Sequence, residues 1–203
     1  MAQYLALPLN TCIINVGYKQ YAPGYNLNGT KATHYGVDFI GSTFASNRGF
    51  FASGNGVVLG VNKTFIPKSG YTVGRWIAVK YTDVANYGSL IVRYYHLERV
   101  DVSVGQSISL DTQLGVYGTT GDYSTGNHIH VEVDTDTVNW QYTPTISSAT
   151  KCGLKPGYTG DRDTTIDPLL VFKRKLSAPE KQTCSVDNDG VWCANITIPD
   201  GFH

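Results

Sequence analysis

Short runs of alternating apolar and polar residues follow one another through the first two thirds of this 203-residue chain. Many of the apolar positions hold β-branched or aromatic side chains, and clusters of Gly, Asn, Asp and Ser separate the runs at hairpin-like intervals. No stretch keeps a sustained helical period. The pattern predicts an all-β (β-dominated) fold of antiparallel strands joined by tight turns. The strands are expected at 54–61, 74–82, 89–97, 99–104, 112–118 and 128–134.

The alternation fades after the last of these strands. Residues 139–165 carry many turn formers, so we expect a long loop or insertion there. The run "IDPLLVF" at 166–172 then predicts an element that closes the domain. The predicted divisions are one domain at 1–176, with its core at about 13–172, and a short C-terminal extension at 177–203.

Charge and hydropathy narrow the classes of partner. Sixteen Lys and Arg residues balance sixteen Asp and Glu residues, so no net field draws the chain to nucleic acid or to an anionic membrane. No apolar run approaches the roughly 18 residues that a membrane-spanning helix needs. The N-terminal segment lacks a basic region before its short apolar run, so it does not resemble a signal peptide. We expect neither nucleic-acid binding nor membrane insertion.

The four cysteines, Cys12, Cys152, Cys184 and Cys193, show none of the close pairs of a structural zinc site. Free thiols or disulfides are therefore expected. In "CSVDNDGVWC" one position of a two-residue turn places Cys184 opposite Cys193, and the next position separates them. The sequence therefore does not decide whether Cys184 and Cys193 form a disulfide.

The stretch "HIHVEVD" at 128–134 places two histidines on one face of a predicted strand. Side chains alternate between faces, so His128, His130 and Glu132 share a face, with about 6.6 Å between successive members at the backbone. Both imidazoles could bind one zinc ion, or one could bind it while the other faces a bound water. Spacing does not choose between these. For Glu132 we weigh a ligand role, a role in orienting a histidine, and simple exposure to water, and we expect the last.

The stretch "HYGVD" at 34–38 holds a second histidine and an aspartate. In a straight strand His34 and Asp38 would stand about 13 Å apart, too far for one metal with bonds of about 2.0–2.2 Å. Gly36 permits a bend between them. These residues taken alone favour a simple turn in which Asp38 caps a backbone group.

With His96, in "YYHL", the chain has four histidines and one aspartate that could bind a metal or transfer protons. Zinc with three protein ligands and an open position activates water and polarises a substrate carbonyl. Such a site also needs a proton acceptor and donor near neutrality, which histidine supplies best. The inventory fits hydrolysis of an amide.

Three motifs occur in a fixed order: "HYGVD" (34–38), "YYHL" (94–97) and "GTTGDYSTGNHIHVEV" (118–133). Together they resemble the lysostaphin-type zinc metallopeptidases, which cut peptide cross-links of bacterial cell walls. The resemblance covers about residues 13–172, and "IDPLLVF" is similar to the family's closing segment. It implies a β-rich fold in which an antiparallel sheet forms the floor of a groove, with loops as walls and zinc at its base.

The resemblance also implies a role for each key side chain. His34, Asp38 and His130 are implied as ligands of one Zn²⁺ per chain. His128 and His96 are implied as the pair that transfers protons and stabilises the tetrahedral oxyanion.

The chain departs from the family in places. A tyrosine before the first histidine often helps at the oxyanion; here the candidates are Tyr21 and Tyr25, and Tyr25 is preferred. The loop at 61–74 and the insertion at 139–165 are individual to this chain, and we expect them to form groove walls.

The predicted function is a zinc-dependent endopeptidase of bacterial cell-wall peptidoglycan. A phage lysin or tail-associated wall hydrolase, with phage tail proteins as partners, is the preferred setting, and a secreted bacterial enzyme is the alternative. A second class is a catalytically silent cell-wall-binding or virion scaffold protein, against which the presence of all five key side chains argues. A third, a cupin-like metal oxygenase with a His-x-His pair, leaves "HYGVD" and "YYHL" unexplained.

Overall fold

The computed structural model describes residues 2–20, 26–27, 30–31, 33–41, 47–122, 124–144, 149–158, 160 and 162–173. Almost all regular structure in these residues is β-strand, which confirms the all-β prediction. The helical elements among them are one 3-10 turn, η1 (Ala149–Cys152), and one short helix, α1 (Pro168–Val171). Neither of these two described helices is long and apolar enough to cross a membrane.

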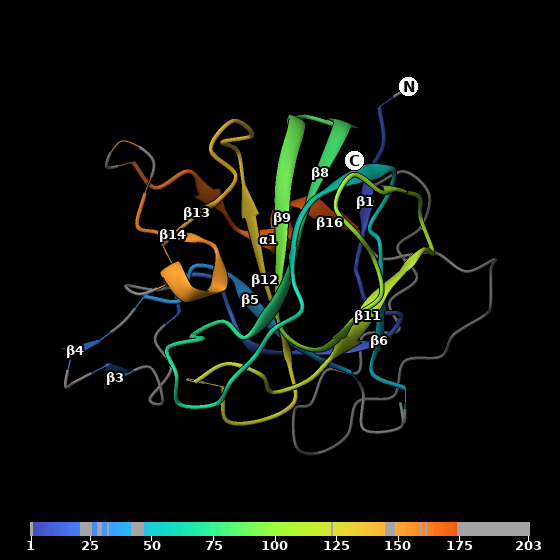
Figure 1. Cartoon of the computed structure of the whole chain (residues 1–203). Helices are drawn as coiled ribbons and strands as arrows, with labels where there is room; N and C mark the ends of the chain where they lie inside the picture. The colour runs from blue at the N-terminus through green and yellow to red at the C-terminus, as the bar shows by residue number, and fades with distance from the viewer. Residues whose placement is uncertain are drawn as a thin grey trace, which may run out of the picture.

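One large antiparallel sheet dominates the fold (Figure 1). Its main path runs, in spatial order, through β10 (Ser107–Ile108), β7 (Gly56–Asn62), β8 (Arg75–Val84), β9 (Gly88–Val100), β12 (Ile129–Asp134), β5 (Val37–Gly41) and β2 (Cys12–Val16). Off this path, β11 (Gln113–Tyr117) pairs with β9 and with β6 (Gly49–Phe51), and β15 (Thr165–Ile166) pairs with β12. The long hairpin of β8 and β9 forms the centre, and β12 lies directly beside β9.

Three two-stranded sheets complete the described structure. Their strands are β1 (Leu5–Ala6) with β16 (Phe172–Lys173), β13 (Tyr142–Thr143) with β14 (Lys155–Pro156), and β3 (Asn26–Leu27) with β4 (Thr30–Lys31). The first two pairs are parallel, so the expectation of antiparallel pairing holds for the main sheet and fails for these. The β1–β16 pair joins the two ends of the described domain, as expected for a closing segment at 166–172.

Five of the six predicted strands correspond to β7, β8, β9, β11 and β12, with ends that differ by a few residues. The predicted strand at 99–104 is wrong, because β9 continues to Val100 and a turn follows it. In this turn the Gln106 amide donates to the Ser103 carbonyl at 3.1 Å. Gly105 adopts a φ of 82°, a conformation that suits glycine. The insertion at 139–165 is also more ordered than a plain loop, since it contains β13, η1 and β14.

The two faces of the central sheet differ in character. Ile129, Val131 and Val133 of β12 belong to the main hydrophobic core, which lies against one face. Because side chains alternate along a strand, His130 and Glu132 occupy the other face. A second, smaller cluster of buried apolar residues packs on that side: Val73, Trp76, Ala78, Tyr95, Cys152 and Leu154.

Two of the four cysteines lie in the described residues. Cys12 and Cys152 are free thiols, and burial raises the pKa of Cys12 to about 11. Cys184 and Cys193 lie outside the described residues, together with the extension at 177–203. The pairing of those two cysteines and the domain boundary at residue 176 therefore stay predictions.

Candidate metal centre

Strand pairing places an aspartate and a histidine face to face. Asp38 of β5 is directly opposite His130 of β12, and His130 is opposite Tyr95 of β9 on its other side. Directly paired residues of antiparallel strands project from the same face. The three side chains therefore form one row across the sheet, on the face away from the main core.

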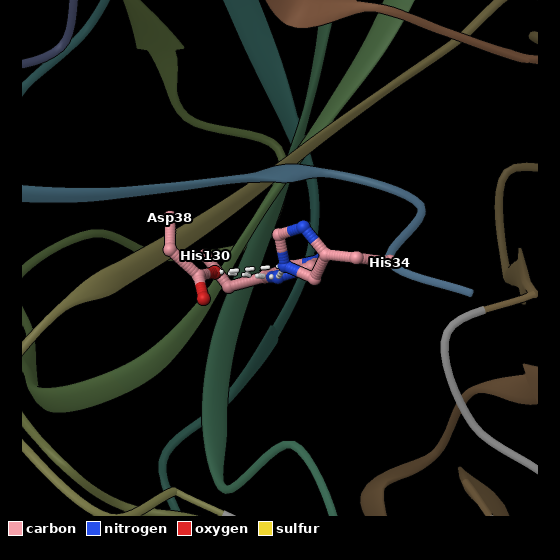
Figure 2. Close-up of side chains that lie close together, drawn as sticks. All are labelled: His34, Asp38 and His130. Carbon is pink, nitrogen blue, oxygen red and sulfur yellow. Dashed lines mark hydrogen bonds and ion pairs between the residues drawn. The ribbon is translucent and has the colours of Figure 1, made fainter. Parts of the chain in front are cut away.

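His34 reaches this row from the segment before β5. Its Nε2 lies 3.0 Å from Asp38 Oδ1 and 2.9 Å from His130 Nδ1. His130 Nδ1 in turn lies 2.9 Å from Asp38 Oδ1, so the three side chains point at one another (Figure 2). All three residues are buried, with exposed fractions of 0%, 3% and 0% for His34, Asp38 and His130. The expectation from "HYGVD" alone, an aspartate that only caps a backbone group, is wrong.

Gly36 makes the convergence possible. A Cβ atom at this position would lie 2.5 Å from the Val131 carbonyl oxygen and 2.6 Å from His130 Nε2. Gly36 does not adopt a positive φ. Its use here is therefore close approach to the His130 ring, in addition to the bend that the sequence suggests.

The hydrogen bonds around the centre indicate which ring nitrogen of His34 carries the proton. His34 Nδ1 lies 2.9 Å from the Gly17 carbonyl oxygen, which only accepts, so Nδ1 carries the proton and Nε2 presents a lone pair. His130 Nε2 has no hydrogen-bond partner among the described residues, although a carboxylate oxygen of Glu132 lies 3.7 Å away. His34 Nε2, His130 Nδ1 and Asp38 Oδ1 thus converge as potential donor atoms.

The ionisation of the centre reflects its buried carboxylate. Burial alone would raise the pKa of Asp38, but its close contacts with His130 and His34 hold that pKa well below its usual range. Burial would lower the pKa of His130, yet its interactions with Asp38 and Glu132 outweigh burial and raise that pKa to about 9. The neighbourhood therefore favours positive charge at this point.

A divalent cation fits the residues present. Arg93 pairs with two of the three buried carboxylates here, on Glu132 and Asp134, whereas the third, on Asp38, contacts histidines, so three formal negative charges lie near one permanent positive charge. Zinc accepts imidazole nitrogen and carboxylate oxygen donors of the kind that converge here. His34, Asp38 and His130 also form a group whose ligand atoms all lie within 4.8 Å of one another.

A second histidine pair lies beside the first. The rings of His96 and His128 are 4.7 Å apart between centroids, and the His96 ring is 6.1 Å from that of His130. His128 Nε2 lies 3.9 Å from Asp38 Oδ2. The structure therefore brings all five predicted site residues together.

His96 reaches the site through a break in strand alternation. The adjacent Tyr95 already stacks its ring on His130, with centroids 5.4 Å apart and planes inclined by 19°. A regular strand would send His96 to the opposite face. Instead, His96 has a φ of 63°, and the register between β8 and β9 shifts around it. Such a bulge re-aims a side chain, and positive φ at a residue other than glycine concentrates at functional sites.

The second pair is arranged to accept protons. His96 Nδ1 lies 2.8 Å from the Thr120 carbonyl oxygen, and His128 Nδ1 lies 2.8 Å from that of Gly126. Both Nδ1 atoms must donate to these carbonyls, which leaves each Nε2 with a lone pair in the neutral ring. Burial, followed by the neighbouring His128, lowers the pKa of His96 to about 3, and burial also lowers the pKa of His128.

Two further expectations have different outcomes. The prediction that Glu132 lies in water is wrong, because the residue is 0% exposed and accepts hydrogen bonds from Tyr95 at 2.9 Å and Arg93 at 3.2 Å. A charged Arg93 inside the apolar run "SLIVRYYHL" is the signal that points to a buried partner. Tyr21 and Tyr25, the candidates for an oxyanion tyrosine, lie outside the described residues.

Comparison with known proteins places this geometry in a family. Residues 32–142 match the model of "Peptidase family M23". An uncharacterised metalloprotease of Buchnera aphidicola subsp. Baizongia pistaciae is 33% identical over 103 residues, which are 49% of this chain and 23% of the relative. The chain therefore spans less than a quarter of that relative's length.

Two solved structures have a similar fold. The catalytic domain of the antimicrobial peptidase lysostaphin from Staphylococcus simulans aligns with a TM-score of 0.53 and 24% identity, over 83% of this chain and 97% of that one. The SpoIIQ–SpoIIIAH pore-forming complex contains a chain that aligns with a TM-score of 0.55 and 18% identity, over 91% of this chain and 100% of that one. These likenesses confirm the lysostaphin-type fold.

Proposed function

The chain belongs to peptidase family M23, the lysostaphin-type metallopeptidases, and on this premise we propose that it is a zinc-dependent endopeptidase of bacterial peptidoglycan. One observation carries the proposal: a buried group of His34, Asp38 and His130 lies directly beside a second histidine pair. A protein that only binds cell wall needs neither the converging donor atoms nor the adjacent proton acceptors.

In this proposal His34, Asp38 and His130 would hold one Zn²⁺ per chain through the converging atoms His34 Nε2, Asp38 Oδ1 and His130 Nδ1. The bound ion would polarise the scissile carbonyl and lower the pKa of a water molecule. The remaining chemistry belongs to side chains of the chain itself. The sheet face presents these groups in one row, so the substrate peptide lies across β5, β12 and β9.

His128 and His96 transfer the protons. His128 has a side chain that is 13% exposed, and its free Nε2 lies on the Asp38 side of the centre, where it can accept a proton from the attacking water. His96, whose Nδ1–H is held by the Thr120 carbonyl, stabilises the tetrahedral oxyanion once its Nε2 has taken up a proton, and it shares with His128 the transfer of the water's proton to the leaving amine. Hydrogen bonds to backbone carbonyls keep both rings in the required orientation.

The setting of the activity is part of the same proposal. We place the peptidase domain at 1–176, with an extension at 177–203, and we place its action in the bacterial cell wall. A phage lysin or a tail-borne wall hydrolase with phage tail partners is the preferred source. The family membership supports the peptidase activity, and the motif resemblance supports the cell-wall substrate.

Digestion of defined peptidoglycans, followed by mass spectrometry of the fragments, tests the proposal. New amino termini at one type of peptide bond are expected, and their formation should stop on removal of the metal and resume after zinc is restored. Undiminished cleavage by protein that is verified to be metal-free would exclude the zinc mechanism. Zinc binding without release of any fragment would instead support a silent wall-binding protein.

A further inference from the structure

A network of buried charged groups lies directly behind His130. Glu132 is two residues further along β12 and projects from the same face. Across the strand pair it faces Arg93 of β9, whose Nη1 lies 3.2 Å from Glu132 Oε2. Arg93 Nη2 also contacts Asp134 Oδ2 at 2.8 Å. Arg93 and Glu132 are 0% exposed and Asp134 is 3% exposed, so the whole network is removed from water.

Neutral hydrogen bonds hold Glu132 in one orientation. The Tyr95 hydroxyl donates to Glu132 Oε2 at 2.9 Å. The Thr143 hydroxyl lies 2.9 Å from both carboxylate oxygens. With these contacts in place, Glu132 Oε1 lies 3.7 Å from His130 Nε2, on the side of the ring away from Asp38.

This arrangement bears on the orientation and tautomer of His130. A carboxylate beside Nε2 favours the proton on that nitrogen, which leaves the Nδ1 lone pair directed at His34 and Asp38. Buried charges are costly unless they are paired, and the Arg93 guanidinium supplies the opposite charge to the Glu132 carboxylate at 3.2 Å.

We propose that Glu132, held by Arg93, Tyr95 and Thr143, is a positioning residue that directs His130 Nδ1 toward the metal. The inference rests on the proposed zinc-dependent function and extends it to a residue that touches neither metal nor substrate. It also links the centre to the insertion at 139–165, because Thr143 belongs to β13 and Arg93 Nε donates to the Trp140 carbonyl at 2.9 Å.

The test compares two carboxylate-to-amide variants, Glu132→Gln and Asp134→Asn, in the full chain. Asp134 is a matched control because it is buried on the same strand face and pairs with the same Arg93. Zinc affinity is measured by competition with a chromophoric chelator, without substrate. We expect Glu132→Gln to weaken zinc binding about 10- to 100-fold and Asp134→Asn to change it less than about threefold.

Nitrogen-15 NMR of the imidazole rings gives an independent readout of the same two variants. In the zinc-loaded wild-type chain His130 should be protonated at Nε2, and this signal should be lost or shifted in Glu132→Gln but kept in Asp134→Asn. Wild-type zinc affinity in Glu132→Gln, or equal losses in both variants, would overturn the positioning role. Failure of the wild-type chain to bind zinc would overturn the proposed function and this inference with it.

A second variant, which changes no charged group, provides the test if Glu132→Gln does not fold. Thr143→Val has nearly the same shape and no charge change, and it removes the hydroxyl that donates to Glu132. Circular dichroism and thermal unfolding establish that the variant is folded. We expect a smaller loss of zinc affinity in the same direction. Unchanged affinity in folded Thr143→Val, with Glu132→Gln unfolded, would overturn the inference.

Discussion

The four histidines of the site form two pairs that differ in their contacts and in the direction of the pKa shifts found within them. His34 and His130 are 0% exposed and contact the Asp38 carboxylate, and the pKa of His130 rises to about 9. His96 and His128 lie beside the first pair, donate hydrogen bonds to backbone carbonyls, and have lowered pKa values. The contrast shows that neighbours, not residue type, set the direction in which the pKa values of His130, His96 and His128 shift.

The first pair should be the more sensitive to substitution. Asp38→Ala or His130→Ala removes one of three converging donor atoms, so we expect the zinc content to fall from one ion per chain to none. Peptidoglycan cleavage should fall to background in both variants. Metal analysis of purified protein, together with fragment release, checks this outcome. Full zinc content in either variant would contradict the assignment of ligands.

The second pair should separate activity from metal binding. His128→Ala leaves His34, Asp38 and His130 in place, so zinc content should stay that of the wild-type chain. Loss of the proton acceptor should lower kcat/KM by about 10²- to 10⁴-fold. The same metal analysis and a cleavage assay measure both effects. An empty metal site in His128→Ala, with a filled one in His130→Ala, would reverse the two roles.

Gly36→Ala should disturb the first pair without removing any ligand. The added Cβ would meet the Val131 carbonyl and the His130 ring, and such overpacking costs about 1–3 kcal/mol of unfolding free energy. Gly126→Ala is the control, because its Cβ would have no atom within 4 Å. Urea unfolding and zinc titration of both variants make the comparison. Equal free energies of unfolding for the two variants would show that a Cβ atom at position 36 does not destabilise the protein.

The dependence of kcat/KM on pH tests the second histidine pair without any substitution in the protein. A base must be neutral to accept a proton, and the pKa values of His96 and His128 both lie below the ordinary 6.5. The acidic fall in kcat/KM should therefore come below pH 6.5, with activity retained at that pH. Initial rates between about pH 4.5 and 8 at fixed zinc concentration measure this. A fall centred above pH 6.5 would show that neither ring is the base.

The strands of the site could be predicted because their signals are local. Alternation of apolar side chains identifies β7, β8, β9, β11 and β12, and the ordered motifs identify the five residues that the structure brings together. The parallel pairs β1–β16 and β13–β14 join segments that no local pattern links. Short strands of this kind depend on tertiary packing rather than on propensity.

The alternating pattern of apolar and polar residues does not predict two features of the site. His96 shares a side with Tyr95 only because a positive φ interrupts β9. The sequence predicts Glu132 in water because the partners of this residue are distant in sequence: Arg93 is 39 residues away and Thr143 belongs to the insertion. The charged Arg93 within an apolar run is the one local clue to that network.

The most direct test of the division between the two pairs is the position of the metal itself. Anomalous diffraction at the zinc edge, from crystals of the zinc-loaded chain, locates the ion without reference to activity. The expected result is a single peak in contact with His34 Nε2, Asp38 Oδ1 and His130 Nδ1, with His96 and His128 free of the ion. A peak ligated by His128 in place of His130, or no peak at this row, would contradict the assignment.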